Sequence, residues 1–203
     1  MDNKTPISIL SEEFSKLPGI GSKTAMRMAY FYVHHKHNIQ PLINALEKVS
    51  SNLDKCVICN IITNKNNNPC QYCADELRNK NLICIVENDT DVEHIEKSNS
   101  FKGVYHILGG LISPLSNISS NDIELLSLKK RLDGGTDNFE IIIATNFTTE
   151  GEATGLFIRQ YLKDFNNIKF SRLASGLPFG SNLEYVDSYT IGKAIDRRIE
   201  YDS

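Results

Sequence analysis

Apolar residues between positions 7 and 53 recur every three or four residues, which is the spacing of amphipathic helices. A Pro-Gly pair at 18–19 interrupts the first stripe, a second stripe follows Gly21, and a third begins near Ile39. The pattern predicts three helices that form a compact first unit. The apolar members of the three stripes are Ile7, Leu10, Phe14 and Leu17; Ala25, Met28, Ala29, Tyr32 and Val33; and Leu42, Ile43, Leu46, Val49 and Leu53.

From Leu82 onward the pattern changes to short runs rich in β-branched residues, separated by longer segments with helical spacing. Strands that alternate with helices are typical of a mostly parallel, doubly wound sheet, so this part of the chain is expected to be an α/β domain. The predicted strands are 82–87, 104–108, 140–146 and 168–173, and the predicted helices are 90–98, 121–132, 151–164 and 189–199.

Composition narrows the class of protein without naming a function. The 203 residues are 40% hydrophobic and carry a formal net charge of −3, so bulk charge gives no argument for nucleic acid. Residues 1–48 are mildly basic, with six basic and four acidic side chains, which permits local phosphate contacts. No apolar run approaches the roughly 20 residues of a membrane span, and the N-terminus does not resemble a signal peptide. We therefore expect a cytoplasmic protein with reduced thiols.

The stretch "LPGIGSKTAMRMA" at 17–29 resembles a phosphate-binding P-loop at first sight. A P-loop, however, follows a strand and places glycine directly before its Lys-Ser/Thr pair. Here a helical stripe precedes the turn, and Ser22 separates Gly21 from Lys23. Both requirements fail, which excludes the P-loop.

The same stretch fits two helices joined by a glycine hairpin. Gly19 and Gly21 leave backbone N–H groups open to an oxyanion, and the dipole of the second helix favours a phosphate at its N-terminus. Lys23 and Arg27 lie four residues apart, on the face opposite the apolar stripe. This arrangement predicts a helix-hairpin-helix unit that grips the DNA backbone without reading bases. The alternative is an ordinary turn between helices with two solvated basic residues.

Five cysteines divide into two knuckles and one isolated residue. Cys56-x-x-Cys59 and Cys70-x-x-Cys73 are separated by ten residues, a spacing that supplies four thiolates for one tetrahedral Zn²⁺. With no open coordination position, such an ion is structural and folds an asparagine-rich segment that lacks its own core. The alternative is a chance cluster of free thiols. Cys84, inside a predicted strand, is interpreted as a small buried hydrophobic residue.

Acidic residues follow the first predicted strand. Glu87 ends it, and Asp89 and Asp91 come just beyond, where the carboxyl ends of parallel strands bind ligands. Carboxylates at this edge could hold Mg²⁺ for phosphoryl or phosphodiester chemistry. The next candidate strand end, 144–146, offers only Ala, Thr and Asn, and the following acids, Glu150 and Glu152, belong to the start of a helix. The catalytic set is therefore incomplete.

Taken in order, the motifs resemble the RecR family of bacterial recombination mediators over nearly the whole chain. The resemblance is carried by "LPGIGSKTAMRMA", the four cysteines, "ICIVE", "YHILGG", "SPL", "IIIATN", "TTEGEATG" and "RLASGLPFGSNLEYVD". It implies a Toprim domain over about 81–170 and a ring-shaped oligomer, commonly a tetramer, that encircles or clamps DNA. It also implies work with RecO and RecF in loading RecA onto gapped DNA coated by single-strand binding protein.

The resemblance also implies a division of the chain and roles for individual residues. The parts are a DNA-binding unit at 1–54, a zinc finger at 55–76, the Toprim domain at 80–173 and a Walker B-like or oligomerisation segment at 174–203. DNA contacts are assigned to Gly19, Gly21, Lys23 and Arg27, zinc ligands to the four knuckle cysteines, the Toprim acids to Glu87, Asp89 and Asp91, and partner binding to Glu150 and Glu152. Toprim enzymes usually place Asp-x-Asp where this chain has "ATN", which argues against catalysis.

Three functions remain open at this point. The first is a non-enzymatic repair mediator that binds single- and double-stranded DNA without sequence preference, works at the bacterial nucleoid and carries one zinc ion per chain. The second is a Mg²⁺-dependent Toprim enzyme, a primase or nuclease, that uses Glu87 with Asp89 and Asp91. The third is a zinc-dependent adaptor that makes no contact with DNA. The uncharged strand end at 144–146 favours the mediator over the enzyme, and the Lys23/Arg27 face disfavours the adaptor.

Overall fold

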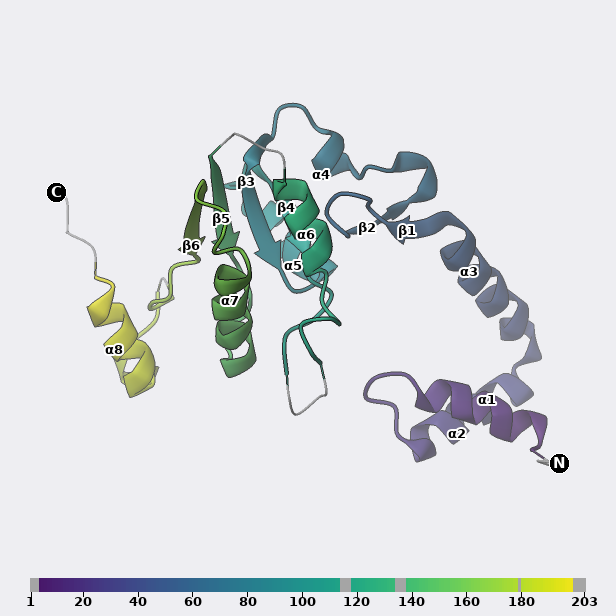
Figure 1. Cartoon of the computed structure of the whole chain (residues 1–203). Coiled ribbons are helices and arrows are strands. Elements are labelled where there is room, and N and C mark those ends of the chain that lie inside the picture. Colours follow the sequence, from purple (N-terminus) through teal and green to yellow (C-terminus); the bar gives the residue numbers. More distant parts are fainter. Residues whose placement is uncertain (1–3, 114–117, 134–137, 179, 199–203) are drawn as a thin grey trace. The chain divides into compact units, whose positions relative to one another are not determined.

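The computed structural model describes residues 4–113, 118–133, 138–178 and 180–198. The chain forms two compact units: residues 1–54 with 64–66 make the N-terminal unit, and residues 55–63 with 67–203 make the second unit (Figure 1).

The N-terminal unit contains the three predicted helices, which are confirmed as α1 (Pro6–Ser15), α2 (Ser22–His34) and α3 (Ile39–Asn52), with a 3₁₀ turn at Lys36–Asn38. Thr5 caps α1, because its hydroxyl accepts a hydrogen bond from the Ser8 amide at 3.4 Å. The α1 and α2 helices pack together through a stacked pair of rings, Phe14 and Tyr32, whose centroids are 5.8 Å apart. The first two stripes therefore form the small core, with Ala25 and Ala29 fully buried. The expected third contribution is wrong, because α3 has no buried residue and its Ile43, Leu46 and Val49 are 40–60% exposed.

The cysteine segment contains short elements that the sequence pattern did not predict. Strands β1 (Leu53–Lys55) and β2 (Ile62–Asn64) pair as a two-stranded sheet, a 3₁₀ turn covers Lys65–Asn67, and α4 (Gln71–Ala74) is a single helical turn. Elements of three or four residues carry too little periodicity to be recognised in a sequence.

The main sheet confirms the predicted parallel α/β architecture. Its strands are β3 (Asn79–Val86), β4 (Gly103–Ile107), β5 (Phe139–Ile143) and β6 (Ile168–Arg172), in the order β4-β3-β5-β6, and every pair is parallel. All four predicted strands are present. Because β3 lies between β4 and β5, the chain leaves the carboxyl end of β3 in one direction and later returns on its other side. This edge is the kind of switch point where open α/β sheets bind ligands.

The predicted helices of the second unit are present as α5 (Asp89–Lys97), α6 (Leu125–Leu132), α7 (Thr149–Tyr161) and α8 (Ser188–Asp196). The α6 helix begins later than the expected 121. The cause is a local turn, in which the Ser119 amide and hydroxyl both donate to the Asp122 carboxylate at 2.7 Å. The prediction for α8 extended to residue 199, which lies outside the described residues. No helix in the described part of the chain is long and apolar enough to cross a membrane.

Both faces of the sheet are covered, as a doubly wound fold requires. On one face, buried residues of β3 and β5 pack with α6 and α7. On the other face, buried residues of β3 and β4 pack with Val92 of α5 and with the four knuckle cysteines. The cysteine segment, called the knuckle from here on, has no core of its own and is instead buried against this face of the sheet. The first face contains Ile83, Ile85, Ile141, Ile143, Leu128, Leu132, Ile158 and Leu162, and the second contains Cys84, Val86, Tyr105 and Ile107.

Candidate functional site

The glycine hairpin between α1 and α2 has the geometry of an anion site. Gly19 has φ +76°, a conformation that L side chains rarely adopt, and the Ile20 amide donates to the Leu17 carbonyl at 3.1 Å to close the turn. Gly21 is the N-cap of α2 and offers no side chain to cap the first-turn N–H groups. These groups, together with the helix dipole, therefore face outward and can receive an oxyanion.

Lys23 and Arg27 stand on the exposed side of α2, one turn apart, whereas Ala25 and Ala29 are fully buried. Neither cation forms an ion pair or a side-chain hydrogen bond with another residue that the structure describes. Both charges are thus available to phosphates near the hairpin. The structure places four predicted residues at the start of one exposed helix face: Gly19, Gly21, Lys23 and Arg27. Their contact with DNA stays a prediction.

The four knuckle cysteines converge on one point. Their sulfur atoms all lie within 4.8 Å of one another, and the side chains are buried, with Cys73 the most exposed at 9%. The turn around Cys56 is closed by backbone bonds, because the Cys56 amide donates to the Ile61 carbonyl at 2.7 Å and the Asn60 amide donates to the Cys56 carbonyl at 3.0 Å. The Cys70 amide also points at the Cys56 sulfur, at 3.3 Å. The cluster is close enough to hold one metal ion.

The acid–base properties of this cluster also suit a cation. Cys59 and Cys70 have their sulfur atoms 3.5 Å apart. The hydrogen bond from the Cys59 thiol holds the pKa of Cys70 well below its usual range, and the same bond raises the pKa of Cys59. Hydrogen bonds to the neighbouring cysteines and burial both oppose ionisation of the Cys59 thiol. A divalent cation that replaces the thiol protons allows all four sulfurs to ionise.

Three contacts fix the knuckle to the sheet and its helices. The Ile107 amide donates to the Cys59 carbonyl at 2.8 Å, and the Asn60 side chain donates to the Ser127 hydroxyl of α6 at 2.9 Å. The Ile62 amide donates to the Asp89 carboxylate at 2.6 Å. Folding of the knuckle is therefore coupled to the order of this part of the α/β unit.

The predicted Toprim acids do not gather into one metal-binding group. Glu87 accepts a hydrogen bond from the Asn146 side chain at 3.0 Å, which joins the carboxyl ends of β3 and β5. Asp89 accepts the bond from the knuckle described above, and Asp91 accepts the Asn88 amide at 3.1 Å as half of a capping box on α5. Among the described residues, the knuckle cysteines are the only set of three or more Cys, His, Asp or Glu side chains placed around one point.

Glu150 and Glu152 lie in the first turn of α7, as expected. The N-cap is Thr148, whose hydroxyl accepts the Gly151 amide at 3.1 Å. A side chain at Gly151 would be impossible, because its Cβ would stand 2.0 Å from the Asn146 carbonyl oxygen. This close approach folds the segment after β5 tightly against the helix start, so the two acids lie on a well-defined turn.

Sequence reasoning missed Arg172, the last residue of β6. Its guanidinium pairs with the Glu152 carboxylate at 2.9 Å and lies 4.7 Å from the centre of the Phe147 ring. The only sequence signal was an arginine at the end of a predicted strand, which on most strands is a solvated surface residue.

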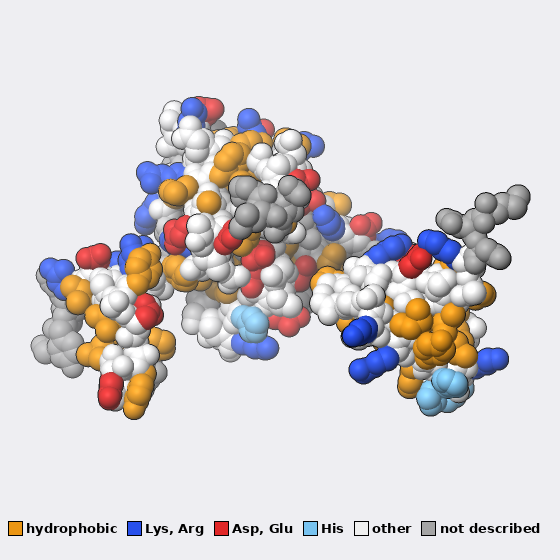
Figure 2. Space-filling model, turned by 90° about the horizontal axis from the view of Figure 1, so that it is seen from below, with side chains coloured by type: hydrophobic (Ala, Val, Ile, Leu, Met, Phe, Trp, Pro, Cys, Tyr) orange, Lys and Arg blue, Asp and Glu red, His pale blue; other side chains and the backbone are white. Residues whose placement is uncertain are grey.

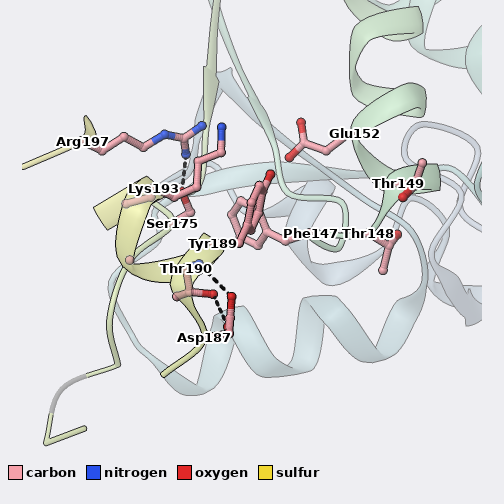
Figure 3. Close-up of a pocket in the computed structure, with 12 residues that line it drawn as sticks. Phe147, Thr148, Thr149, Glu152, Ser175, Asp187, Tyr189, Thr190, Lys193 and Arg197 are labelled. Carbon is pink, nitrogen blue, oxygen red and sulfur yellow. Dashed lines mark hydrogen bonds between the residues drawn. The ribbon is translucent and has the colours of Figure 1, made fainter. Parts of the chain in front are cut away.

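A second feature that the sequence did not reveal is an open pocket of about 740 Å³ between the start of α7 and α8. Figure 3 shows Lys193 of α8 and Arg197, the residue that follows this helix, along one part of the pocket wall and Glu152 along another. Arg197 donates to the Ser175 hydroxyl at 2.5 Å, and Asp187 caps α8 by accepting the Thr190 amide at 2.9 Å. The pocket therefore presents charges of both signs beside the rings of Phe147 and Tyr189.

Comparison with known families covers most of the chain. A model described as "RecR, helix-hairpin-helix" matches residues 7–50, one described as "Toprim domain" matches residues 81–174, and one described as "RecR, C-terminal" matches residues 176–199. The first of these contains the glycine hairpin with Lys23 and Arg27. The second contains the acidic edge and the start of α7.

Named relatives extend the match to nearly full length. A protein from Rhodococcus jostii (strain RHA1) named Recombination protein RecR is 40% identical over 201 residues, which cover 95% of this chain and 96% of the relative. Proteins of the same name from Geobacter sp. (strain M21) and Citrifermentans bemidjiense (strain ATCC BAA-1014 / DSM 16622 / JCM 12645 / Bem) are each 42% identical over 188 residues, 93% of both chains. With this identity across matching hairpin, Toprim and C-terminal segments, the chain belongs to the RecR family of recombination mediators.

Proposed function

We propose that this protein is a non-enzymatic mediator that binds single- and double-stranded DNA without sequence preference at the bacterial nucleoid. In this role it acts with RecO and RecF to help load RecA onto gapped DNA coated by single-strand binding protein. The observation that carries the proposal is the hairpin surface, where uncapped N–H groups of α2 adjoin the unpaired cations of Lys23 and Arg27. Such a surface reaches phosphates and not base edges.

The metal in this proposal is one structural Zn²⁺ per chain, held by Cys56, Cys59, Cys70 and Cys73. Four buried sulfur donors that lie within 4.8 Å suit a soft, tetrahedral ion. The ion would lock the knuckle against the sheet and would take no part in chemistry, because four protein ligands leave no position for water or substrate.

Self-association into a ring, most simply a tetramer, is supported by exposed apolar side chains at both ends of the chain. Figure 2 shows such side chains gathered on the N-terminal unit, where Tyr30, Phe31, Leu46 and Val49 are 46–60% exposed. The C-terminal segment exposes a second set, Leu183, Tyr185, Tyr189 and Ile195, at 58–83%. We infer that each set contacts its counterpart on another copy, and two such interfaces on one chain can close four copies into a ring. The proposed division into 1–54, 55–76, 80–173 and 174–203 assigns one patch to each terminal part.

The acidic turn at Glu150 and Glu152 is the proposed contact for RecO. Both acids lie in the first turn of α7, and the Glu152 side chain is 52% exposed. Carboxylates held in this way favour encounter with a basic protein surface.

Solution mass tests the assembly part of the proposal. We expect the free protein to have a mass of several chains, to keep that mass when DNA binds, and to gain mass when RecO is added. Light scattering coupled to size-exclusion chromatography measures all three states. A monomer that stays monomeric with DNA and with RecO would contradict the proposal.

We expect no ATP hydrolysis and no DNA cleavage in the presence of Mg²⁺. Glu87 is bonded to the Asn146 amide, and Asp89 and Asp91 are bonded to backbone amides elsewhere. Among the described residues these acids belong to no group of three or more ligands around one point, as a catalytic metal clamp would need. The measurement is nicking of supercoiled plasmid by wild type and by Glu87→Gln. Mg²⁺-dependent nicking that disappears in the variant would support the alternative function, a Toprim primase or nuclease.

A further inference from the structure

Arg172 is held by more groups than an ordinary surface arginine. Its side chain is only 18% exposed, and its guanidinium donates to the Thr145 hydroxyl and to the Asn146 carbonyl, each at 3.3 Å. The same group forms the ion pair with Glu152 and covers the ring of Phe147. One side chain at the end of β6 thus contacts four residues of the segment that leads from β5 into α7.

The surrounding structure is shaped to receive this cation. A side chain at Gly155 would place its Cβ 3.3 Å from an Arg172 nitrogen and 3.1 Å from the Ile143 side chain, so glycine at this position leaves room for the guanidinium. The buried Nε of Arg172 has no hydrogen-bond partner in the described structure, so the two terminal nitrogens make all of its hydrogen bonds. A cation this buried depends on the acceptors and the carboxylate that face it.

The two acids of the turn differ in their surroundings. Glu152 is paired with Arg172, whereas the Glu150 carboxylate makes no hydrogen bond or ion pair with any described residue. Because Glu150 and Glu152 are two positions apart on a helix, their side chains diverge by roughly 200° around the helix axis. Glu152 is therefore directed at β6, whereas Glu150, which is half-buried, leaves the helix on another side.

We propose that Arg172 is a positioning residue, that Glu152 is its internal counter-ion, and that Glu150 presents the free carboxylate to a basic partner. This inference rests on the proposed function, in which the acidic turn contacts RecO, and it divides roles that the sequence assigned jointly. Arg172 acts through the segment 145–152, whose carbonyls and ring it holds, and does not touch the partner itself.

Thermal stability separates the two acids. Glu152→Gln should lower the melting temperature by about 2–4 °C, because Arg172 loses its only carboxylate partner among the described residues. Glu150→Gln removes the same charge from the same helix turn and is the matched control, with an expected change below about 1 °C. Equal melting of both variants would overturn the role of Glu152 as counter-ion.

Binding to RecO, used as the probe, tests the positioning role. Glu150→Gln should weaken binding about tenfold at low salt. Arg172→Lys keeps the charge but loses the planar fork, so it should weaken binding about threefold or more. The decisive variant combines Glu150→Gln with Arg172→Lys. It should bind RecO no more weakly than Glu150→Gln alone, because Arg172 can position the Glu150 carboxylate only where that carboxylate is present.

The possible failures are distinguishable. If wild type binds RecO but the Glu150→Gln and Arg172→Lys losses simply add, Arg172 acts elsewhere and the inference is wrong. If Glu152→Gln weakens binding as much as Glu150→Gln without a change in melting, Glu152 faces the partner directly. If wild type does not bind RecO at all, the proposed partner function fails, and the partner role of Glu150 fails with it.

Discussion

Replacing Cys56 or Cys70 with serine should yield a protein that has lost its metal and most of its thermal stability. Both thiols are buried, at 1% and 2% exposure, in the cluster that also contains Val86, Tyr105 and Ile107 of the sheet. Loss of the ion would therefore release the knuckle and expose one face of the sheet, with aggregation as the expected outcome. Structural zinc sites contribute folding energy directly, so the effect should exceed that of an ordinary core substitution.

Metal analysis and melting curves measure this effect. Wild-type protein purified without any chelator should contain about one zinc ion per chain. Cys84→Ala is the matched control, because Cys84 is buried in the same cluster at 2% exposure but lies outside the group of four sulfurs. It should keep its zinc and lose only modest stability. Wild type without zinc, or a Cys84 variant that loses it, would contradict the site.

Replacing both Lys23 and Arg27 with alanine should reduce DNA affinity by about one to two orders of magnitude at moderate salt, with the assembly intact. Each phosphate contact contributes about 0.9 to the slope of log K against log salt, so the slope should fall by about two for each chain engaged. The loss should be the same for unrelated sequences, because phosphate contacts carry no sequence information. Fluorescence anisotropy across a salt series measures both quantities.

The control is Lys36→Ala with Lys48→Ala, which removes the same charge from exposed positions of the N-terminal unit outside α2. It should leave affinity nearly unchanged. Equal losses of DNA affinity in the two double variants would mean that net charge alone drives binding. Undiminished DNA binding by the Lys23/Arg27 variant would mean that the hairpin is only a structural turn.

Sequence reasoning succeeded where a short stretch determines its own structure. The apolar spacing of α1, α2 and α3, the four strands, and the glycine hairpin at Gly19 and Gly21 all follow from local rules, and the structure confirms them. The cysteine spacing also determined which four thiols meet. In each case the interacting groups are neighbours in sequence or belong to one repeating pattern.

What the sequence could not reveal depends on contacts between distant segments. The bond between Asp89 and the Ile62 amide, or between Glu87 and Asn146, requires the knuckle and two strand ends to be placed first. Because of these contacts, acids that the sequence placed together at a possible Mg²⁺ site are hydrogen-bonded to separate partners. Arg172 is the clearest case, because its contacts with Asn146 and Glu152 arise only when β6 lies beside β5.

The most direct test of the central claim measures RecA assembly on gapped DNA coated with single-strand binding protein, in the presence of RecO and RecF. We predict that wild type accelerates assembly, that the Lys23→Ala/Arg27→Ala variant does not, and that DNA strands remain uncut throughout. Assembly that proceeds equally well without this protein, or with the hairpin variant in its place, would contradict the account.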